Sequence, residues 1–119
     1  MTATLKWILA ALWTAFIVYA LSSEPSGIPR FPWLAAPGVD KVIHAILFGV
    51  EAILLFWSFE RKPSAAILVG VVVWCAAFGG VMELVQLFWV EGRTGSIPDL
   101  LADAFGAIVV AIFVVMKRK

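Results

Sequence analysis

Charged residues and cysteine are both scarce in this sequence. Of its 119 residues, 14% are charged and 63% are hydrophobic, and the mean hydropathy is +1.02. A soluble domain is about one-quarter charged, and a chain this short could not hide so much apolar surface from water. The one cysteine, Cys75, excludes an internal disulfide and a multi-cysteine metal site, and the net charge of +1 does not indicate a nucleic-acid partner. The composition therefore indicates an integral membrane protein.

Four long apolar runs divide the chain, at residues 5–22, 39–59, 64–90 and 97–116. Each is close to the roughly 20 residues that an α-helix needs to cross a ~30 Å hydrocarbon core. Prolines between residues 23 and 38, and charged turns after the second and third runs, separate them. With no internal repeat, the chain is predicted to be one all-α domain, a bundle of four transmembrane helices. The first run also resembles a signal peptide, but its bulky side chains favour a retained helix.

The distribution of basic residues predicts the orientation. With four spans, both termini lie on the same side as the turn between the second and third runs. Six lysines and arginines belong to that side and three to the other, as counted along the sequence. Because basic residues accumulate on the cytoplasmic side, both termini are predicted to be cytoplasmic, in a multi-pass protein of the cell (cytoplasmic) membrane.

Polar residues are not scattered but gather at one predicted end of the bundle, the outer one. Pairs spaced three or four residues apart share one face of a helix, and intramembrane charges usually face the bundle interior and mark function. Glycines beside these residues (Gly79, Gly80 and Gly106) leave room for close helix approach. A polar pocket open to the outside is therefore predicted. Its residues are Asp40, Lys41, His44, Glu83, Gln86, Arg93, Asp99 and Asp103.

Each of these residues also has a simpler interpretation. Asp40 and Asp99 fit helix capping, because they stand where helices begin. Arg93 fits a solvated loop cation and His44 a hydrogen-bonded packing residue. Glu83 and Gln86 fit polar contacts between helices. Glu51 shares the face of His44 but lies nearer mid-membrane, and is interpreted as a protonated or paired structural group. The convergence of the others on three helices favours a functional site.

The ordered set of motifs resembles the VanZ-like family. It comprises Asp40-Lys41-x-x-His44-x-x-x-Phe48-Gly49, then Glu83-x-x-Gln86, Arg93, and Asp99-Leu-Leu-Ala-Asp103-x-x-Gly106. Two positions depart from the family pattern: Asp103 stands where Asn is usual, which adds a carboxylate, and Val110 stands where a second glycine often follows. The resemblance implies a small bacterial or archaeal membrane protein, and its namesake is associated with low-level resistance to teicoplanin.

Two functions follow as hypotheses. The first is a protein of the cell envelope that binds a polar lipid headgroup, or a lipid-linked cell-wall precursor, in the outward-facing pocket. The second is a membrane-embedded enzyme acting on such a lipid, with His44 and Glu83 as general base and acid. No cofactor and no metal is predicted, although one histidine with carboxylates would suit Mg²⁺ or Mn²⁺. A purely structural bundle and an ion path are further alternatives, and the sequence does not indicate an oligomeric state.

Overall fold

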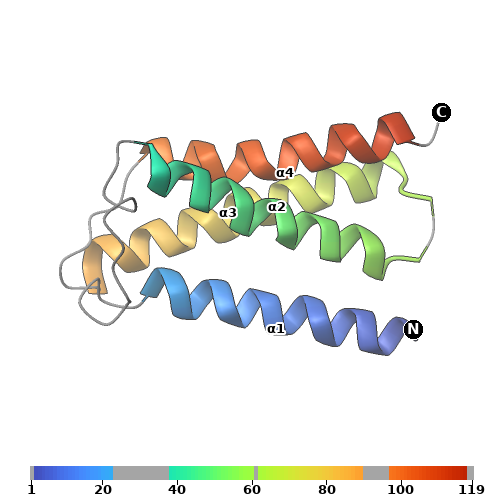
Figure 1. Cartoon of the computed structure of the whole chain (residues 1–119), viewed down its shortest axis with the longest axis horizontal. Coiled ribbons are helices and arrows are strands. Elements are labelled where there is room, and N and C mark those ends of the chain that lie inside the picture. The colour runs from blue at the N-terminus through green and yellow to red at the C-terminus, as the bar shows by residue number, and fades with distance from the viewer. Residues whose placement is uncertain (1, 23–37, 61, 90–96, 118–119) are drawn as a thin grey trace.

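Four α-helices make up the bundle. The computed structural model describes residues 2–22, 38–60, 62–89 and 97–117. Within them lie α1 (Ala3–Ser22), α2 (Val39–Ser58), α3 (Ala65–Trp89) and α4 (Ile97–Lys117). Successive helices run in opposite directions, so the start of α1 and the end of α4 lie at the same end of the bundle (Figure 1). The predicted all-α bundle of four helices is confirmed.

The outer surface of the bundle is apolar, unlike that of a soluble protein, and the interior combines an apolar core with several buried polar residues. Leu12, Tyr19 and Phe105 are 61%, 64% and 62% exposed. All four helices are long and apolar enough to cross a membrane. Lipid can cover such a surface, whereas ionisable groups in a membrane face the bundle interior. The buried polar residues are His44, Glu51, Ser58, Glu83, Gln86, Asp99 and Asp103.

Glycines set the closest helix contacts, although not all of those predicted do so. The most extensive contact in the described bundle joins α2 and α4. Gly106 lies directly against the carbonyl of Ala45, where a Cβ atom would overlap the backbone of α2. Gly79 lies against the side chain of Asp103 in the same way. Gly80 does not, because a Cβ atom there would meet no described atom within 4 Å.

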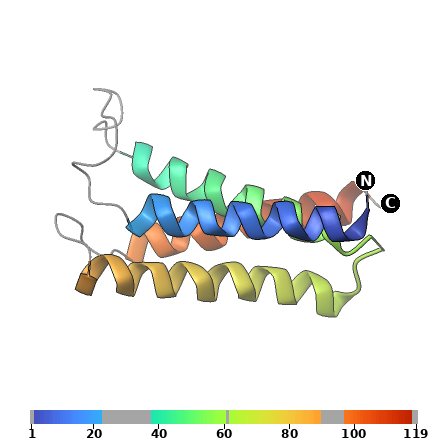
Figure 2. The same ribbon diagram turned by 90° about the horizontal axis from the view of Figure 1, so that it is seen from below.

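Helix α1 is a packed member of the bundle. It contacts α2 and α3, and among the described residues it has no comparable contact with α4, which lies across the bundle (Figures 1 and 2). Its buried residues Ala10, Ile17 and Leu21 form one stripe along the helix. The Nε1 group of Trp13 donates a hydrogen bond to the carbonyl of Leu47 on α2, at 2.9 Å. Packing and a hydrogen bond between helices therefore both hold α1.

Charge and aromatic rings meet at the end of the bundle that holds the start of α1. Lys6 Nζ lies 2.9 Å from Glu60 Oε1 and 5.0 Å from the ring centroid of Trp57. The rings of Trp7 and Phe59 are in edge contact, with centroids 5.1 Å apart. Tryptophan and lysine are typical of the membrane–water interface. This end therefore has the composition of an interface, and the buried ionisable cluster lies at the other end.

Candidate functional site

The beginnings of α2 and α4 and the end of α3 lie together at one end of the bundle (Figure 1). Helix α2 starts after Gly38, whose φ of +83° is the left-handed conformation that glycine adopts without strain. Gly38 is therefore the N-cap of α2, and the interpretation of Asp40 as the N-cap is wrong. Asp40 is the second residue of the helix, and its side chain lies outside the described part of the structure, as does Arg93.

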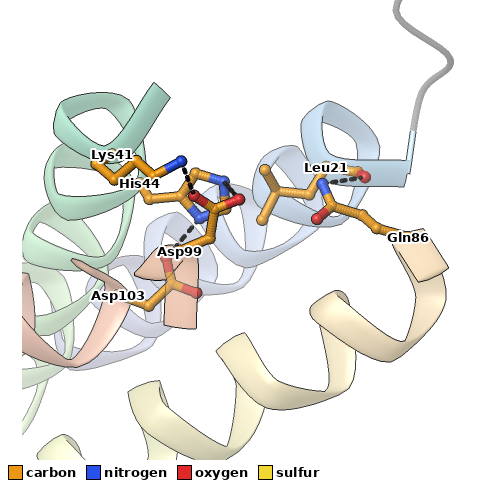
Figure 3. A network of polar contacts seen from close by, with 6 residues as sticks. All are labelled: Leu21, Lys41, His44, Gln86, Asp99 and Asp103. Carbon is orange, nitrogen blue, oxygen red and sulfur yellow. Dashed lines mark hydrogen bonds and ion pairs between the residues drawn. The ribbon is translucent and has the colours of Figure 1, made fainter. Parts of the chain in front are cut away.

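A histidine and an aspartate form the centre of the cluster. His44 Nδ1 on α2 lies 2.7 Å from Asp103 Oδ1 on α4, and the two residues are 5% and 0% exposed (Figure 3). With its proton on Nδ1, the imidazole donates this hydrogen bond, which fixes the plane of the ring. The other ring nitrogen, Nε2, faces Asp99 and lies 3.8 Å from its Oδ2. His44 is therefore held between two carboxylates of α4.

A second pair lies beside the first. Lys41 Nζ is 3.1 Å from Asp99 Oδ1, and the side chain of Lys41 is 40% exposed while that of Asp99 is 11% exposed (Figure 3). Asp99 stands in the first turn of α4, where a carboxylate also complements the helix dipole. The sequence Ser96-Ile-Pro-Asp99 fits a capping box, in which Ser96 would be the N-cap, but Ser96 lies outside the described residues. Asp99 therefore joins α4 to α2 through Lys41 and also stands where a carboxylate stabilises the start of α4.

Glu83 brings α3 into the cluster. It is 8% exposed, and one of its oxygens lies within 4.8 Å of donor atoms of both His44 and Asp103. Gly79 is one turn earlier on the same face of α3, and a Cβ atom built there would come within 2.5 Å of Asp103 Oδ2. The absence of a side chain at Gly79 therefore makes room for the Asp103 carboxylate between α4 and α3.

Gln86 forms a different contact. Its Nε2 group donates a hydrogen bond to the carbonyl of Leu21 at 3.0 Å, and the residue is 2% exposed (Figure 3). Carbonyls in the last turn of a helix have no partner within that helix, so this bond closes the end of α1. The bond ties α3 to α1 and does not point into the cluster of ionisable groups. A role for Gln86 in ligand binding stays a prediction.

Glu51 forms a separate buried contact away from this cluster. The hydroxyl of Thr14 lies 2.5 Å from its Oε1, and Trp74 Nε1 donates to the same oxygen at 3.5 Å. Glu51 is 0% exposed, and its Oε1 is paired, in agreement with one of its two predicted interpretations, whereas its Oε2 has no hydrogen-bond partner among the described residues. Thr14 was not predicted as the partner of Glu51. Its signal was a hydroxyl within an otherwise apolar first run.

Two grooves lie away from the cluster and are almost wholly apolar. One, of about 720 Å³, runs between α2 and α4 and is lined by residues such as Phe56, Val110 and Phe113. The other, of about 560 Å³, is lined by residues of α1, α2 and α3 that include Trp7 and Val71. Both suit hydrocarbon and not a polar ligand. The polar pocket predicted over the ionisable cluster stays a proposal.

These features define a multi-pass membrane protein with a buried ionisable cluster at one end of its bundle. Residues 4–118 match the VanZ/LLP1 family, and the chain belongs to that family. The chain is also similar to an uncharacterised protein of the fission yeast Schizosaccharomyces pombe, with 30% identity over 105 residues. That match covers 87% of this chain but 62% of the yeast protein. No solved structure matches the chain.

The yeast relative limits what family membership implies for function. The expectation of a bacterial or archaeal membrane protein came from the resemblance, yet a similar protein occurs in a eukaryote. A function tied to bacterial cell-wall precursors therefore does not follow from similarity alone. The chemistry of the site must carry the functional argument.

Proposed function

We propose that the protein binds the polar headgroup of a membrane lipid, or of a lipid-linked cell-wall precursor, at the cluster formed by α2, α3 and α4. The observation that carries the proposal is the burial of three carboxylates and a histidine together, on three different helices. Burying ionisable groups in a membrane is costly, and such groups usually mark a functional site. The cost suggests a selected function for the cluster.

The residue types suit a headgroup that offers both donors and an anionic group. Carboxylates such as Glu83 accept hydrogen bonds from hydroxyl and amino groups. Lys41, whose side chain is 40% exposed, supplies a cation for a phosphate, and charge-assisted hydrogen bonds of this kind are the stronger ones. Arg93, Asp40 and Gln86 are proposed to complete the binding site. The lipid tail would then lie along the apolar surface of the helices.

Native mass spectrometry of protein released from mild detergent tests this proposal. Wild type should retain a lipid with a polar headgroup. Glu83→Gln should lose most of this lipid, because a neutral amide takes the place of a carboxylate that accepts hydrogen bonds. Glu60→Gln is the matched control, since Glu60 is a carboxylate at the opposite end that pairs with Lys6. Equal lipid retention in wild type and Glu83→Gln would contradict headgroup binding at the cluster.

An enzymatic function is the second candidate, and one contact favours it. Asp103 holds the His44 ring through Nδ1 at 2.7 Å, which leaves Nε2 as the nitrogen available to take or give a proton. Incubating the protein with total membrane lipids and comparing species by mass spectrometry tests it. A product that forms with wild type and not with His44→Gln would support catalysis, and unchanged lipids would leave binding as the function.

The membrane orientation and the link to teicoplanin are part of the same proposal. With both termini cytoplasmic, the cluster faces the outside of the cell, where cell-wall precursors are presented. Reporter fusions at each terminus test the orientation, and a reporter active only outside the cytoplasm would contradict it. Expression in a teicoplanin-susceptible host should raise the inhibitory concentration modestly, and Glu83→Gln should abolish that increase.

A further inference from the structure

The same cluster contains groups that metal ions bind. His44, Glu83 and Asp103 each offer one nitrogen or oxygen, and these atoms all lie within 4.8 Å of one another. The three residues come from α2, α3 and α4, and they are 5%, 8% and 0% exposed. Divalent cations are commonly bound by side chains on facing helices of a bundle that project inward. Small side-chain rotations would bring the three donors onto a single ion.

Asp103 has a buried oxygen that makes no hydrogen bond with the described residues. Asp103 Oδ1 accepts from His44, whereas Asp103 Oδ2 has no hydrogen-bond partner among the described residues. This second oxygen faces α3 at Gly79, one turn before Glu83. Buried carboxylate oxygens are normally paired or bound to a metal. The free oxygen is therefore directed toward the helix that supplies the third donor.

We propose that His44, Glu83 and Asp103 form a binding site for one divalent cation. A site made of one imidazole and two carboxylates suits Mn²⁺ or Mg²⁺ better than it suits a metal ion that prefers thiolate ligands. Asp99 and Lys41 stay paired beside the site and hold the start of α4 against α2. This site goes beyond headgroup binding and does not depend on it. If both exist, the ion would give an acidic cluster the means to hold an anionic phosphate.

Mn²⁺ binding to the full chain in detergent tests this proposal directly. After chelator treatment and removal of the chelator, Mn²⁺ alone is titrated, and free Mn²⁺ is followed by electron paramagnetic resonance. Wild type should bind one Mn²⁺ per chain. Asp103→Asn, which keeps the shape of the side chain but removes its charge, should bind at least about tenfold more weakly, and so should Glu83→Gln. Glu51→Gln should bind as wild type does.

Pulsed resonance of the bound ion identifies its ligand. The wild-type spectrum should contain modulation from a directly bound nitrogen, and His44→Gln should remove it. Wild type that binds no more Mn²⁺ than protein-free detergent would overturn the proposal. So would Asp103→Asn and Glu83→Gln variants that both bind Mn²⁺ as wild type does. Because no lipid is added, failure here leaves headgroup binding standing, and lipid retention by metal-free protein is measured separately.

Discussion

Two carboxylates in this bundle are equally buried but differ in their partners. Glu51 and Asp103 are each 0% exposed. Glu51 meets neutral groups, the hydroxyl of Thr14 and the indole N–H of Trp74, and both contacts join helices. Asp103 meets His44, with Asp99 and Glu83 close by. Burial alone therefore does not separate the two acids, and the proposal that Asp103 belongs to a functional site rests on its ionisable neighbours.

The pairing of His44 with Asp103 depends on the close contact between α2 and α4. Breaking this contact should therefore have the largest effect on stability. A side chain at Gly106 would overlap the carbonyl of Ala45 and force the helices apart. Gly106→Val should lower the free energy of unfolding by about 3 kcal/mol, at the upper end of overpacking costs. Thermal unfolding in detergent measures it.

Gly80→Val provides the control for that substitution. A Cβ atom at Gly80 meets no described atom within 4 Å, so the same valine should change the unfolding temperature little. Equal losses in the two variants would show that valine itself, and not the helix contact, causes the effect.

At Glu51, the stability of the bundle should depend on the hydrogen bonds of the side chain and not on its charge. Glu51→Gln keeps an oxygen that can accept from Thr14 and Trp74, so stability should change little. Glu51→Ala leaves a cavity and leaves the indole of Trp74 without its acceptor, while Thr14 can still donate to the carbonyl of Ala10, and the change should cost about 2–3 kcal/mol. Thermal unfolding of both variants measures this. If the glutamine variant were as unstable as the alanine variant, Glu51 would act through its charge.

A smaller effect on stability is expected from losing the hydrogen bond between Gln86 and the last turn of α1. Gln86→Leu removes the donor to the Leu21 carbonyl and should cost about 0.6 kcal/mol, the average for a hydrogen bond between membrane helices. Hydrogen exchange in the last turn of α1 should accelerate. Lipid retention at the cluster should fall modestly, because Gln86 is also proposed to complete the binding site. Unchanged retention would limit Gln86 to the contact with α1.

The sequence predicted the helices and the end of the bundle where ionisable groups gather. Long apolar runs set the four spans, and alternating directions bring the polar ends of three helices together. The pairing within the cluster was not predictable, because the rotation of each helix decides whether His44 meets Asp103 or Glu83. The acceptor of Gln86 was also not predictable, because every residue has a backbone carbonyl and the sequence does not indicate that the carbonyl of Leu21 accepts this bond.

Lipid retention by Glu83→Gln and Glu51→Gln, measured side by side in native mass spectra, tests the central claim most directly. Both substitutions replace a buried carboxylate with an amide of the same shape, so they differ only in where they stand. The predicted result is loss of the bound lipid from Glu83→Gln and wild-type retention by Glu51→Gln. Equal retention in both variants, or equal loss, would contradict the assignment of different functions to the two acids.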